Sequence, residues 1–400
     1  MKPVLFVTGH APAYRLGALA RLHERERIEL ALFGGRLAHG GAAHAGELPL
    51  PHRQVRPHEL LALAAGGDYR AVVCPTGGRL APLATWAGAR RARVPLLLWA
   101  SLWAHPRTPA HALTYLPLRR LYRSADAVVT YGAHVSAYVR AYGATNVHEA
   151  PQAVDNDFWS APVDLSAPAP PGWPAAAGTA AGAGTAAAAG TAAAGAGAGV
   201  RFLFVGRAVR EKGLSVLLEA WARAGLGGRG ATLALAGADA AELAALAPGA
   251  MLGRGLGGGD GGGPSGGAEG IVSLGRLQPE ALRGLYARCD VLVVPSIATR
   301  TFREPWGLVV NEAMNQGLAV IATDAVGAAA GGLVRDGRNG LVVAARADAL
   351  AGALARLADD AQLRARFGEA AREDVRAFSY DAWAQGFSHA LASVGVARER

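Results

Sequence analysis

Cysteine, lysine and long apolar runs are scarce in this sequence of 400 residues. The two cysteines, Cys74 and Cys289, lie in or beside apolar runs, so we expect buried free thiols in a reducing compartment rather than a disulfide framework. The apolar stretch at 94–104 is far shorter than the roughly 20 residues of a membrane-spanning helix, and the apolar N-terminal run is too short for a signal peptide. We therefore expect a soluble or peripheral protein.

Charged residues make up only 18% of the chain, and the positive ones are concentrated in its first part. Residues 1–160 contain 18 Lys and Arg against 10 Asp and Glu. A basic half can face nucleic acid, an anionic membrane or an anionic substrate, but no basic stripe interleaved with aromatics indicates nucleic acid. The alternative is that these arginines only keep the protein in solution. The arginines expected to contact an anionic lipid surface are Arg90, Arg91, Arg93, Arg119, Arg120 and Arg123.

Two series of short apolar runs alternate with amphipathic segments along the chain. This pattern predicts an α/β protein with two doubly wound, Rossmann-like domains facing a cleft at the carboxyl ends of their strands. We expect an N-terminal domain at 1–160, an Ala/Gly/Pro-rich linker or insertion at 161–199, and a C-terminal domain at 200–378 with a Gly-rich loop at 253–270. A helix at 380–395 is expected to pack back on the N-terminal domain.

The expected elements follow from the same periodicities. The strands are expected at 3–7, 28–33, 71–74, 94–99, 126–131, 201–205, 231–237, 271–274, 290–296 and 318–323. The helices are expected at 16–25, 80–92, 136–143, 214–224, 239–247, 279–288, 308–316, 346–370 and 380–395.

The strand at 201–205 runs directly into a basic turn, GRAVREKG, at 206–213. Gly206 permits close approach of a ligand to the backbone, and Arg207 and Lys212 can straddle an anion near the start of the next helix. Two basic residues on a turn are also common on a solvated surface. No N-terminal strand is followed by the Gly-x-Gly-x-x-Gly fingerprint of dinucleotide-binding loops, and the phosphate-loop pattern Gly-x4-Gly-Lys-Ser/Thr is also missing. A nicotinamide dehydrogenase and a nucleoside triphosphatase are therefore disfavoured.

Two glutamates flank the start of the helix expected at 308–316. Glu304 falls in the loop before it, where backbone N–H groups near Trp306 can receive an anion at the helix N-terminus. Glu312 lies about one turn along the helix and can accept two hydrogen bonds from a diol such as ribose. Either glutamate alone is more often a surface residue, but the whole constellation favours a binding site.

Three segments resemble the retaining glycosyltransferases of family 4, the glycosyl transferases group 1. They are FVGRAVREKG at 204–213, the segment at 293–324 with its Glu-x7-Glu motif, and VRDGRNGLVV at 334–343. The resemblance implies the GT-B fold with its two Rossmann-like domains. It also implies a hexosyltransferase (EC 2.4 class) that moves a sugar from a UDP-, GDP- or other nucleoside-diphosphate sugar to a glycan, lipid-linked or small-molecule acceptor.

The resemblance also assigns roles to individual residues. It implies that Arg207 and Lys212 neutralise the donor diphosphate, that Glu312 binds the ribose, and that Glu304 lies beside the transferred sugar. His105 lies where the family often places a histidine near the donor sugar, so the catalytic set is Glu304, His105, Arg207 and Lys212. Tyr14 and Arg15 belong to the acceptor side, although their turn lacks the Gly-Gly pair frequent in relatives. The donor-binding set is Gly206, Arg207, Lys212, Glu304, Pro305, Trp306, Gly307, Leu308 and Glu312.

Two cations with a helix terminus can replace a metal on the diphosphate. We therefore expect no metal and no other cofactor. The resemblance implies an enzyme of cell envelope polysaccharide biosynthesis. The expected free thiols favour a cytoplasmic protein, and the basic first half favours a peripheral contact with the inner face of the plasma membrane.

Two alternatives remain from the sequence. A nucleotide-sugar 2-epimerase shares the architecture but needs no acceptor. A non-catalytic GT-B scaffold subunit is the other, and the presence of Glu304, Glu312, Arg207 and Lys212 argues against it.

Overall fold

The computed structural model describes residues 1–34, 48–78, 80–169, 173, 199–239, 241–243 and 270–396. Most of the expected linker at 161–199, the loop at 253–270 except Gly270, and most of the helix expected at 239–247 lie outside the described residues. The chain forms two compact units. Unit 1 comprises Met1–Asn156, Arg300–Leu308 and Arg376–Arg400, and unit 2 comprises Asp157–Thr299 and Val309–Val375.

Unit 1 is built on a parallel sheet with the strand order β3-β2-β1-β4-β5-β6-β7. The sequence predicts five of these strands but neither β3 nor β7. Both are only three residues long at the sheet edges and bury none of their side chains, so they give no apolar signal. The strands are β1 (Val4–Thr8), β2 (Ile28–Leu32), β3 (His52–Gln54), β4 (Ala71–Pro75), β5 (Leu96–Ala100), β6 (Ala127–Thr130) and β7 (Val147–Glu149).

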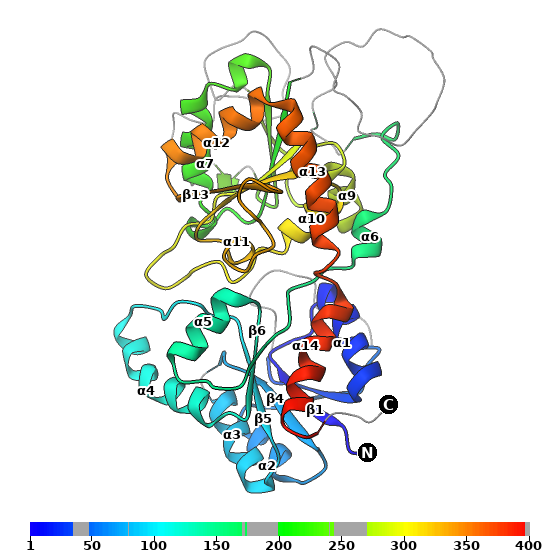
Figure 1. Ribbon diagram of the computed structural model, residues 1–400, viewed down its shortest axis with the longest axis vertical. Coiled ribbons are helices and arrows are strands. Elements are labelled where there is room, and N and C mark those ends of the chain that lie inside the picture. Colours follow the sequence, from blue (N-terminus) through cyan, green and yellow to red (C-terminus); the bar gives the residue numbers. More distant parts are fainter. Residues whose placement is uncertain are drawn as a thin grey trace. The chain divides into compact units, whose positions relative to one another are not determined.

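Helices cover both faces of this sheet (Figure 1). Alternate residues of β1 point to opposite faces, as in any strand. Val4 and Phe6 join a core with α1 and the C-terminal helix α14, whereas Leu5 and Val7 join a core with α2 and α3. The helices are α1 (Ala13–Glu26), α2 (Glu59–Ala65), α3 (Ala81–Ala92), α4 (Pro109–Ser124), α5 (Ala133–Ala141) and α14 (Tyr380–Ser393).

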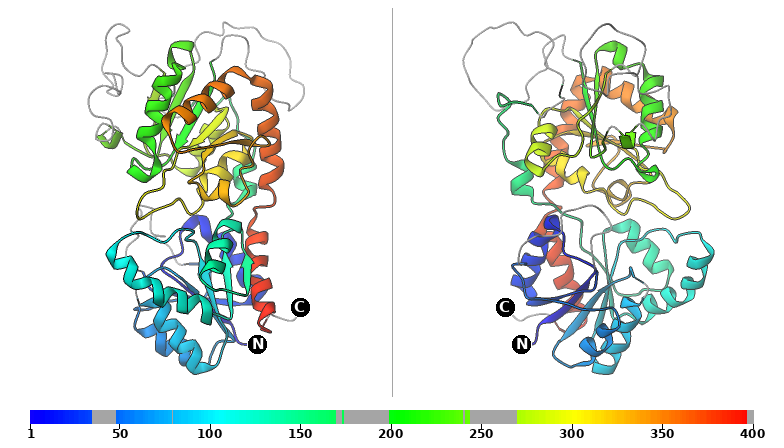
Figure 2. Two further views of the ribbon diagram at one scale, coloured as in Figure 1. Left: turned by 60° about the vertical axis from the view of Figure 1, so that its left-hand side comes forward. Right: turned by 180° about the vertical axis from the view of Figure 1, so that it is seen from behind.

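The last helix, α14, belongs to unit 1 although it comes from the other end of the chain. It lies beside α1 in each view (Figures 1 and 2). Trp383 and Phe387 are fully buried, and the ring of Phe6 lies 5.5 Å from that of Phe387. A Cβ on Gly17 of α1 would lie 2.2 Å from the Tyr380 ring, so only glycine permits this approach of the two helices.

Unit 2 is built on a second parallel sheet, with the strand order β10-β9-β8-β11-β12-β13. One face carries a core in which Phe202 of β8 packs on Trp221 of α7 and Leu350 of α12. The strands are β8 (Arg201–Val205), β9 (Thr232–Ala236), β10 (Ile271–Ser273), β11 (Val291–Val294), β12 (Ala319–Thr323) and β13 (Gly340–Val343). The helices are η1 (Arg210–Lys212), α7 (Leu214–Ala224), η2 (Gly227–Arg229), α9 (Pro279–Tyr286), α10 (Val309–Asn315), α11 (Gly327–Ala330), α12 (Ala347–Asp359) and α13 (Ala361–Val375), while α6 (Asn156–Ser160) spans the unit boundary.

The single helix expected at 346–370 is wrong, because the segment forms α12 and α13 with a break at Asp360. Asp360 takes an extended conformation, and its carboxylate accepts the backbone N–H of Leu363 at 2.8 Å. The side chain thus caps the start of α13, which is a common role of aspartate at a helix N-terminus. The apolar spacing continues through the break, so periodicity alone does not reveal it.

Candidate functional site

The basic turn of unit 2 is shaped by backbone hydrogen bonds at the carboxyl end of β8. The N–H of Gly206 donates to Ala236 O of the neighbouring strand at 2.9 Å, which fixes the point where the chain leaves the sheet. Residues 210–212 then form a single 3-10 turn, and Gly213 follows with a φ of 69°. Arg207 is exposed and Lys212 is half-buried. The turn therefore carries three cationic side chains before α7, those of Arg207, Arg210 and Lys212, and one carboxylate, that of Glu211.

Gly213 is required where the turn meets the segment after β11. A Cβ at this position would lie 1.9 Å from Pro295 O, and the positive φ itself disfavours other residues. The N–H of Ile297 also donates to Glu211 O at 2.9 Å. The loops that follow two neighbouring strands, β8 and β11, are thus locked together at one edge of the sheet. Rossmann-like sheets bind their ligands at this edge.

The start of α7 is suited to an anion. Its first turn contains no acidic residue, and no side chain caps its N-terminus in the described structure. The positive end of the helix dipole therefore lies directly after Lys212.

Glu312 of α10 is the third ionisable residue of unit 2 that the sequence singles out, after Arg207 and Lys212. Its Oε2 atom accepts a hydrogen bond of 2.8 Å from the hydroxyl of Tyr286, which is fully buried at the end of α9. The ring of Trp159 packs edge-on against that of Tyr286. Tyr286 therefore fixes the rotamer of Glu312 and occupies one of its two oxygens.

Burial raises the pKa of Glu312 to about 7, although the hydrogen bond from Tyr286 acts in the opposite direction. Burial and the neighbouring Glu312 carboxylate also raise the pKa of Tyr286, so its hydroxyl stays protonated and remains the donor. Glu312 consequently changes charge near neutral pH. Binding of a diol to Oε1 therefore competes with protonation of the carboxylate.

The Glu304 loop is assigned to unit 1, whereas the sequence places it in the C-terminal domain at 200–378. The indole N–H of Trp103 donates to Glu304 O at 3.1 Å, and Nε2 of His134 lies 3.1 Å from Pro305 O. Trp306 is buried against the ring of His134 and that of Phe378. These contacts explain why the loop groups with unit 1.

His134 is a residue that sequence reasoning missed. Burial lowers its pKa, so the ring is neutral at neutral pH, and because a carbonyl only accepts, Nε2–H is the donor to Pro305. Its ring also meets that of Trp103 edge-on at 5.1 Å. The available signal was its place directly after the carboxyl end of β6, at the start of α5.

His105 lies in a different environment from His134. Its Nε2 is 2.8 Å from His111 O, and its ring packs against those of Tyr115 and Tyr142. Within the described part of the chain, no hydrogen bond or ring contact joins His105 to the Glu304 loop.

Tyr14 and Arg15, expected on the acceptor side, lie in the first turn of α1, after β1. Tyr14 is exposed, whereas Arg15 donates to Gln152 Oε1 at 2.8 Å and lies 4.9 Å from the ring centre of Trp99. This cation–π contact orients the guanidinium at the carboxyl edge of the unit 1 sheet.

Two further properties of the described residues bear on the site. They contain no group of three or more His, Cys, Asp or Glu side chains that could hold a metal ion. Their helices also include none that combines the length and apolar character needed to cross a membrane. Of the cysteines, Cys74 is buried and Cys289 is half-buried, and both are free.

The second half of the chain is similar in sequence to known glycosyltransferases. Residues 199–360 match the family model of the glycosyl transferases group 1. The D-inositol 3-phosphate glycosyltransferase of Corynebacterium glutamicum (strain R) is 41% identical over 114 residues, which are 28% of this chain and 25% of that protein. The enzyme of the same name from Corynebacterium efficiens is 40% identical over 114 residues, 28% of this chain and 24% of that protein. The match thus spans about a quarter of the length of these curated relatives.

Solved structures extend the similarity to nearly the whole chain. Anabaena Alr3699/HepE in complex with UDP and glucose has a TM-score of 0.67 at 18% identity, over 98% of this chain and 100% of that one. This chain has the GT-B fold. The sucrose-phosphate synthase of Thermosynechococcus elongatus gives a TM-score of 0.64 at 20% identity, over 97% and 98% of the two chains. The expected α/β architecture with two Rossmann-like domains is confirmed, and within this GT-B chain the glycosyltransferase match covers the basic turn and Glu312.

Proposed function

We propose that this protein is a retaining glycosyltransferase of family 4 that uses a nucleoside-diphosphate sugar as donor. The observation that carries the proposal is the arrangement in unit 2, where the basic turn at 206–213 and the Tyr286–Glu312 pair lie within the matched residues 199–360. Solved neighbours of the same fold include one with bound UDP, which supports a donor of the UDP-, GDP- or related type. The acceptor is a glycan, a lipid-linked molecule or a small molecule.

The donor-binding residues divide the nucleotide between them. We assign the ribose diol to Glu312, and the diphosphate to Arg207, Lys212 and the backbone at Gly206 and the start of α7. Glu312 suits the ribose because Tyr286 holds its carboxylate in one position while Oε1 accepts no hydrogen bond within the described structure. The diphosphate suits two cations beside a helix terminus that carries no acidic first-turn residue.

The transfer step needs little covalent chemistry from the protein. The bond from the anomeric carbon to the leaving diphosphate breaks, the acceptor oxygen bonds to that carbon on the same face, and the acceptor proton passes to the departing phosphate oxygen. Positive charge on Arg207 and Lys212 stabilises the diphosphate as its charge develops. We assign the sugar and distal phosphate to His105, Glu304 and the Pro305–Leu308 backbone, and the acceptor side to Tyr14 and Arg15.

We further propose that the reaction requires no metal ion, because the two cations and the helix terminus do the work of one. The enzyme is proposed to act in cell envelope polysaccharide biosynthesis, in the cytoplasm and peripherally at the inner face of the plasma membrane. A peripheral protein of this kind needs no helix that crosses the bilayer.

The test is a panel of nucleotide sugars incubated with the protein in EDTA, with and without mixtures of sugar phosphates, glycans and lipid-linked acceptors. Released nucleoside diphosphate and the mass of the product are measured, and the anomeric coupling of the product is read by NMR. We expect an acceptor-dependent product of the donor's own anomeric configuration.

Other outcomes contradict the proposal in distinct ways. A change of the donor sugar without any acceptor indicates a 2-epimerase of the same fold. An inverted anomeric centre removes the retaining mechanism, and activity lost in EDTA but restored by a divalent cation removes metal independence. If none of the nucleotide sugars is bound or turned over, the result indicates a non-catalytic scaffold subunit.

A further inference from the structure

Helices α3 and α4 of unit 1 expose an unusual number of leucines. All residues at 112–117 in α4 are exposed, including Leu113 at 82% and Leu116 at 69%. Leu80 and Leu83, at the start of α3, are 61% and 45% exposed. Five of the nine large apolar side chains that are exposed in the described part of the chain lie at these two helices. Single exposed leucines need no explanation, but a cluster of this kind marks an interaction surface.

The same two helices are strongly basic. Neither Ala81–Ala92 nor Pro109–Ser124 contains an aspartate or glutamate. Among the described residues no ion pair involves any of their arginines or the C-cap residue of α3, so this positive charge is not neutralised within unit 1. The arginines are Arg90, Arg91, Arg93, Arg119, Arg120 and Arg123.

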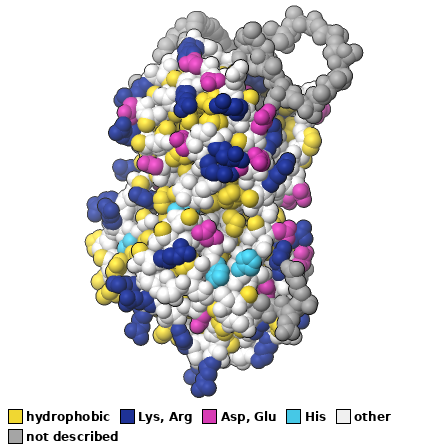
Figure 3. Space-filling model, in the orientation of Figure 1, with side chains coloured by type: hydrophobic (Ala, Val, Ile, Leu, Met, Phe, Trp, Pro, Cys, Tyr) yellow, Lys and Arg dark blue, Asp and Glu magenta, His cyan; other side chains and the backbone are white. Residues whose placement is uncertain are grey.

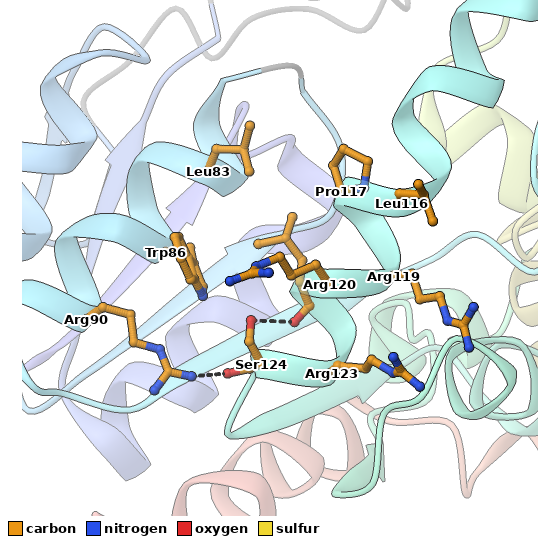
Figure 4. Close-up of a pocket in the computed structure, with 10 residues that line it drawn as sticks. Leu83, Trp86, Arg90, Leu116, Pro117, Arg119, Arg120, Arg123 and Ser124 are labelled. Atoms are coloured by element: carbon orange, nitrogen blue, oxygen red, sulfur yellow. Dashed lines mark hydrogen bonds between the residues drawn. The ribbon is translucent and has the colours of Figure 1, made fainter.

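A groove of about 920 Å³ separates α3 from α4, with leucine and tryptophan side chains beside the arginines. In Figure 4, Trp86 and Arg120 point toward one another across it, while Arg119 and Arg123 extend from the other side of α4. Arg90 reaches across to donate to Ser124 O at the end of α4, which ties the two helices together. Figure 3 shows hydrophobic and basic side chains side by side over α4.

We propose that α3 and α4 form a docking surface for a bilayer that contains anionic phospholipids. Leu113 and Leu116 enter the headgroup region, and the arginines contact lipid phosphates around them. Basic helices with exposed apolar side chains bind in this way, because buried apolar area and electrostatic attraction act together. Long arginine side chains can lie along apolar surface while their guanidinium groups reach the phosphates.

Charge favours this occupant over a second copy of the chain. A two-fold interface would bring two sets of unneutralised arginines together, and like charges across an interface are unfavourable. The inference extends the proposed peripheral location and is independent of the donor site. The groove is lined neither by the residues assigned to the donor nor by Tyr14 and Arg15, which are assigned to the acceptor side.

The test is co-sedimentation of the full chain with vesicles of phosphatidylcholine alone, or of phosphatidylcholine with phosphatidylglycerol, in the absence of nucleotide. We expect binding to the anionic vesicles only, and weaker binding as salt rises from about 0.1 M to about 1 M, where the screening length falls to roughly 3 Å. Arg120→Gln with Arg123→Gln is expected to lower the partition coefficient by about 30-fold, because each arginine contributes a factor of roughly five. Leu113→Ser with Leu116→Ser is expected to lower it by about tenfold or more.

The matched control is Arg356→Gln with Arg366→Gln, which removes two exposed arginines of α12 and α13. This control is expected to bind as the unaltered protein does. The proposal is overturned if anionic vesicles are not bound, or if the helix variants bind as tightly as the control. A dimer in sedimentation velocity that Leu113→Ser with Leu116→Ser abolishes would assign the face to a second copy instead.

Discussion

At the scale of single residues, the proposed chemistry depends on Arg207 and Lys212. We expect Arg207→Ala and Lys212→Ala each to lower turnover by about two to three orders of magnitude, because each removes roughly 3 to 4 kcal/mol of stabilisation from the developing diphosphate charge. Steady-state kinetics with a saturating donor measure this loss. Arg356→Ala, which removes an exposed arginine of α12, is the control and should leave turnover unchanged. Near-normal rates in both turn variants would remove the diphosphate site.

Glu312 gives a prediction about pH. Its pKa of about 7 means that the carboxylate, which is the form that accepts the diol, is gained as pH rises through 7 and lost as pH falls. Donor affinity should therefore increase from pH 6 to pH 8. Tyr286→Phe removes the hydrogen bond that lowers this pKa, so affinity near neutral pH should fall by about tenfold and the rise should move to higher pH.

Calorimetric titrations of nucleoside diphosphate over this pH range check the prediction. Glu312→Gln supplies the pH dependence of the ligand alone, because its amide does not titrate. The same pH profile in Glu312→Gln, Tyr286→Phe and the unaltered protein would show that the carboxylate takes no part in binding.

At the scale of elements, the loop at 303–307 is positioned by side chains of unit 1. Trp103→Phe keeps an aromatic side chain but removes the indole N–H that donates to Glu304 O, so we expect kcat to fall by about ten- to a hundredfold. The affinity for a nucleoside monophosphate, which lacks the distal phosphate assigned to this loop, should not change, because Arg207, Lys212 and Glu312 lie in unit 2.

Trp86→Phe is the matched control for this prediction. The indole N–H of Trp86 has no hydrogen-bond partner in the described structure, so the substitution removes none. Equal kcat values in Trp103→Phe and Trp86→Phe would show that the hydrogen bond does not position the loop.

Elements with strong apolar patterns could be predicted from the sequence, and short or capped ones could not. The strand at 201–205 and the helix at 214–224 are confirmed to the residue. The buried strand ends directly before Gly206, and the amphipathic helix begins directly after Gly213. The break at Asp360 depends on a single helix cap, which leaves the apolar spacing of the sequence unchanged. Strand β3 consists of three exposed residues, so it adds no apolar alternation to the sequence. The roles of Trp103 and His134 could not be predicted, since they depend on contacts with residues about 170 to 200 positions away.

At the scale of the whole molecule, the chain crosses between its two units more than once. Unit 1 needs the C-terminal helix, because Trp383 and Phe387 complete one face of its core. We expect Trp383→Ala to lower the free energy of unfolding of unit 1 by about 3 to 5 kcal/mol, as truncation of a buried aromatic residue does.

Denaturant unfolding followed by circular dichroism measures this loss. Gln385→Ala, on the exposed face of the same helix, is the control and should change the free energy of unfolding by less than about 0.5 kcal/mol. Equal effects of the two substitutions would show that α14 contributes little to the stability of unit 1.

The central claim is that unit 2 binds the nucleoside diphosphate of a sugar donor. Isothermal titration calorimetry of UDP, GDP, ADP and CDP in EDTA tests it most directly, on the unaltered protein and on Lys212→Ala and Glu312→Gln. We expect at least one nucleotide to bind with one-to-one stoichiometry, and both variants to bind it at least about tenfold more weakly, since each loses a charged contact to the ligand. If no nucleotide binds in EDTA, or if both variants bind as tightly as the unaltered protein, then the turn at 206–213 and Glu312 do not form the donor site.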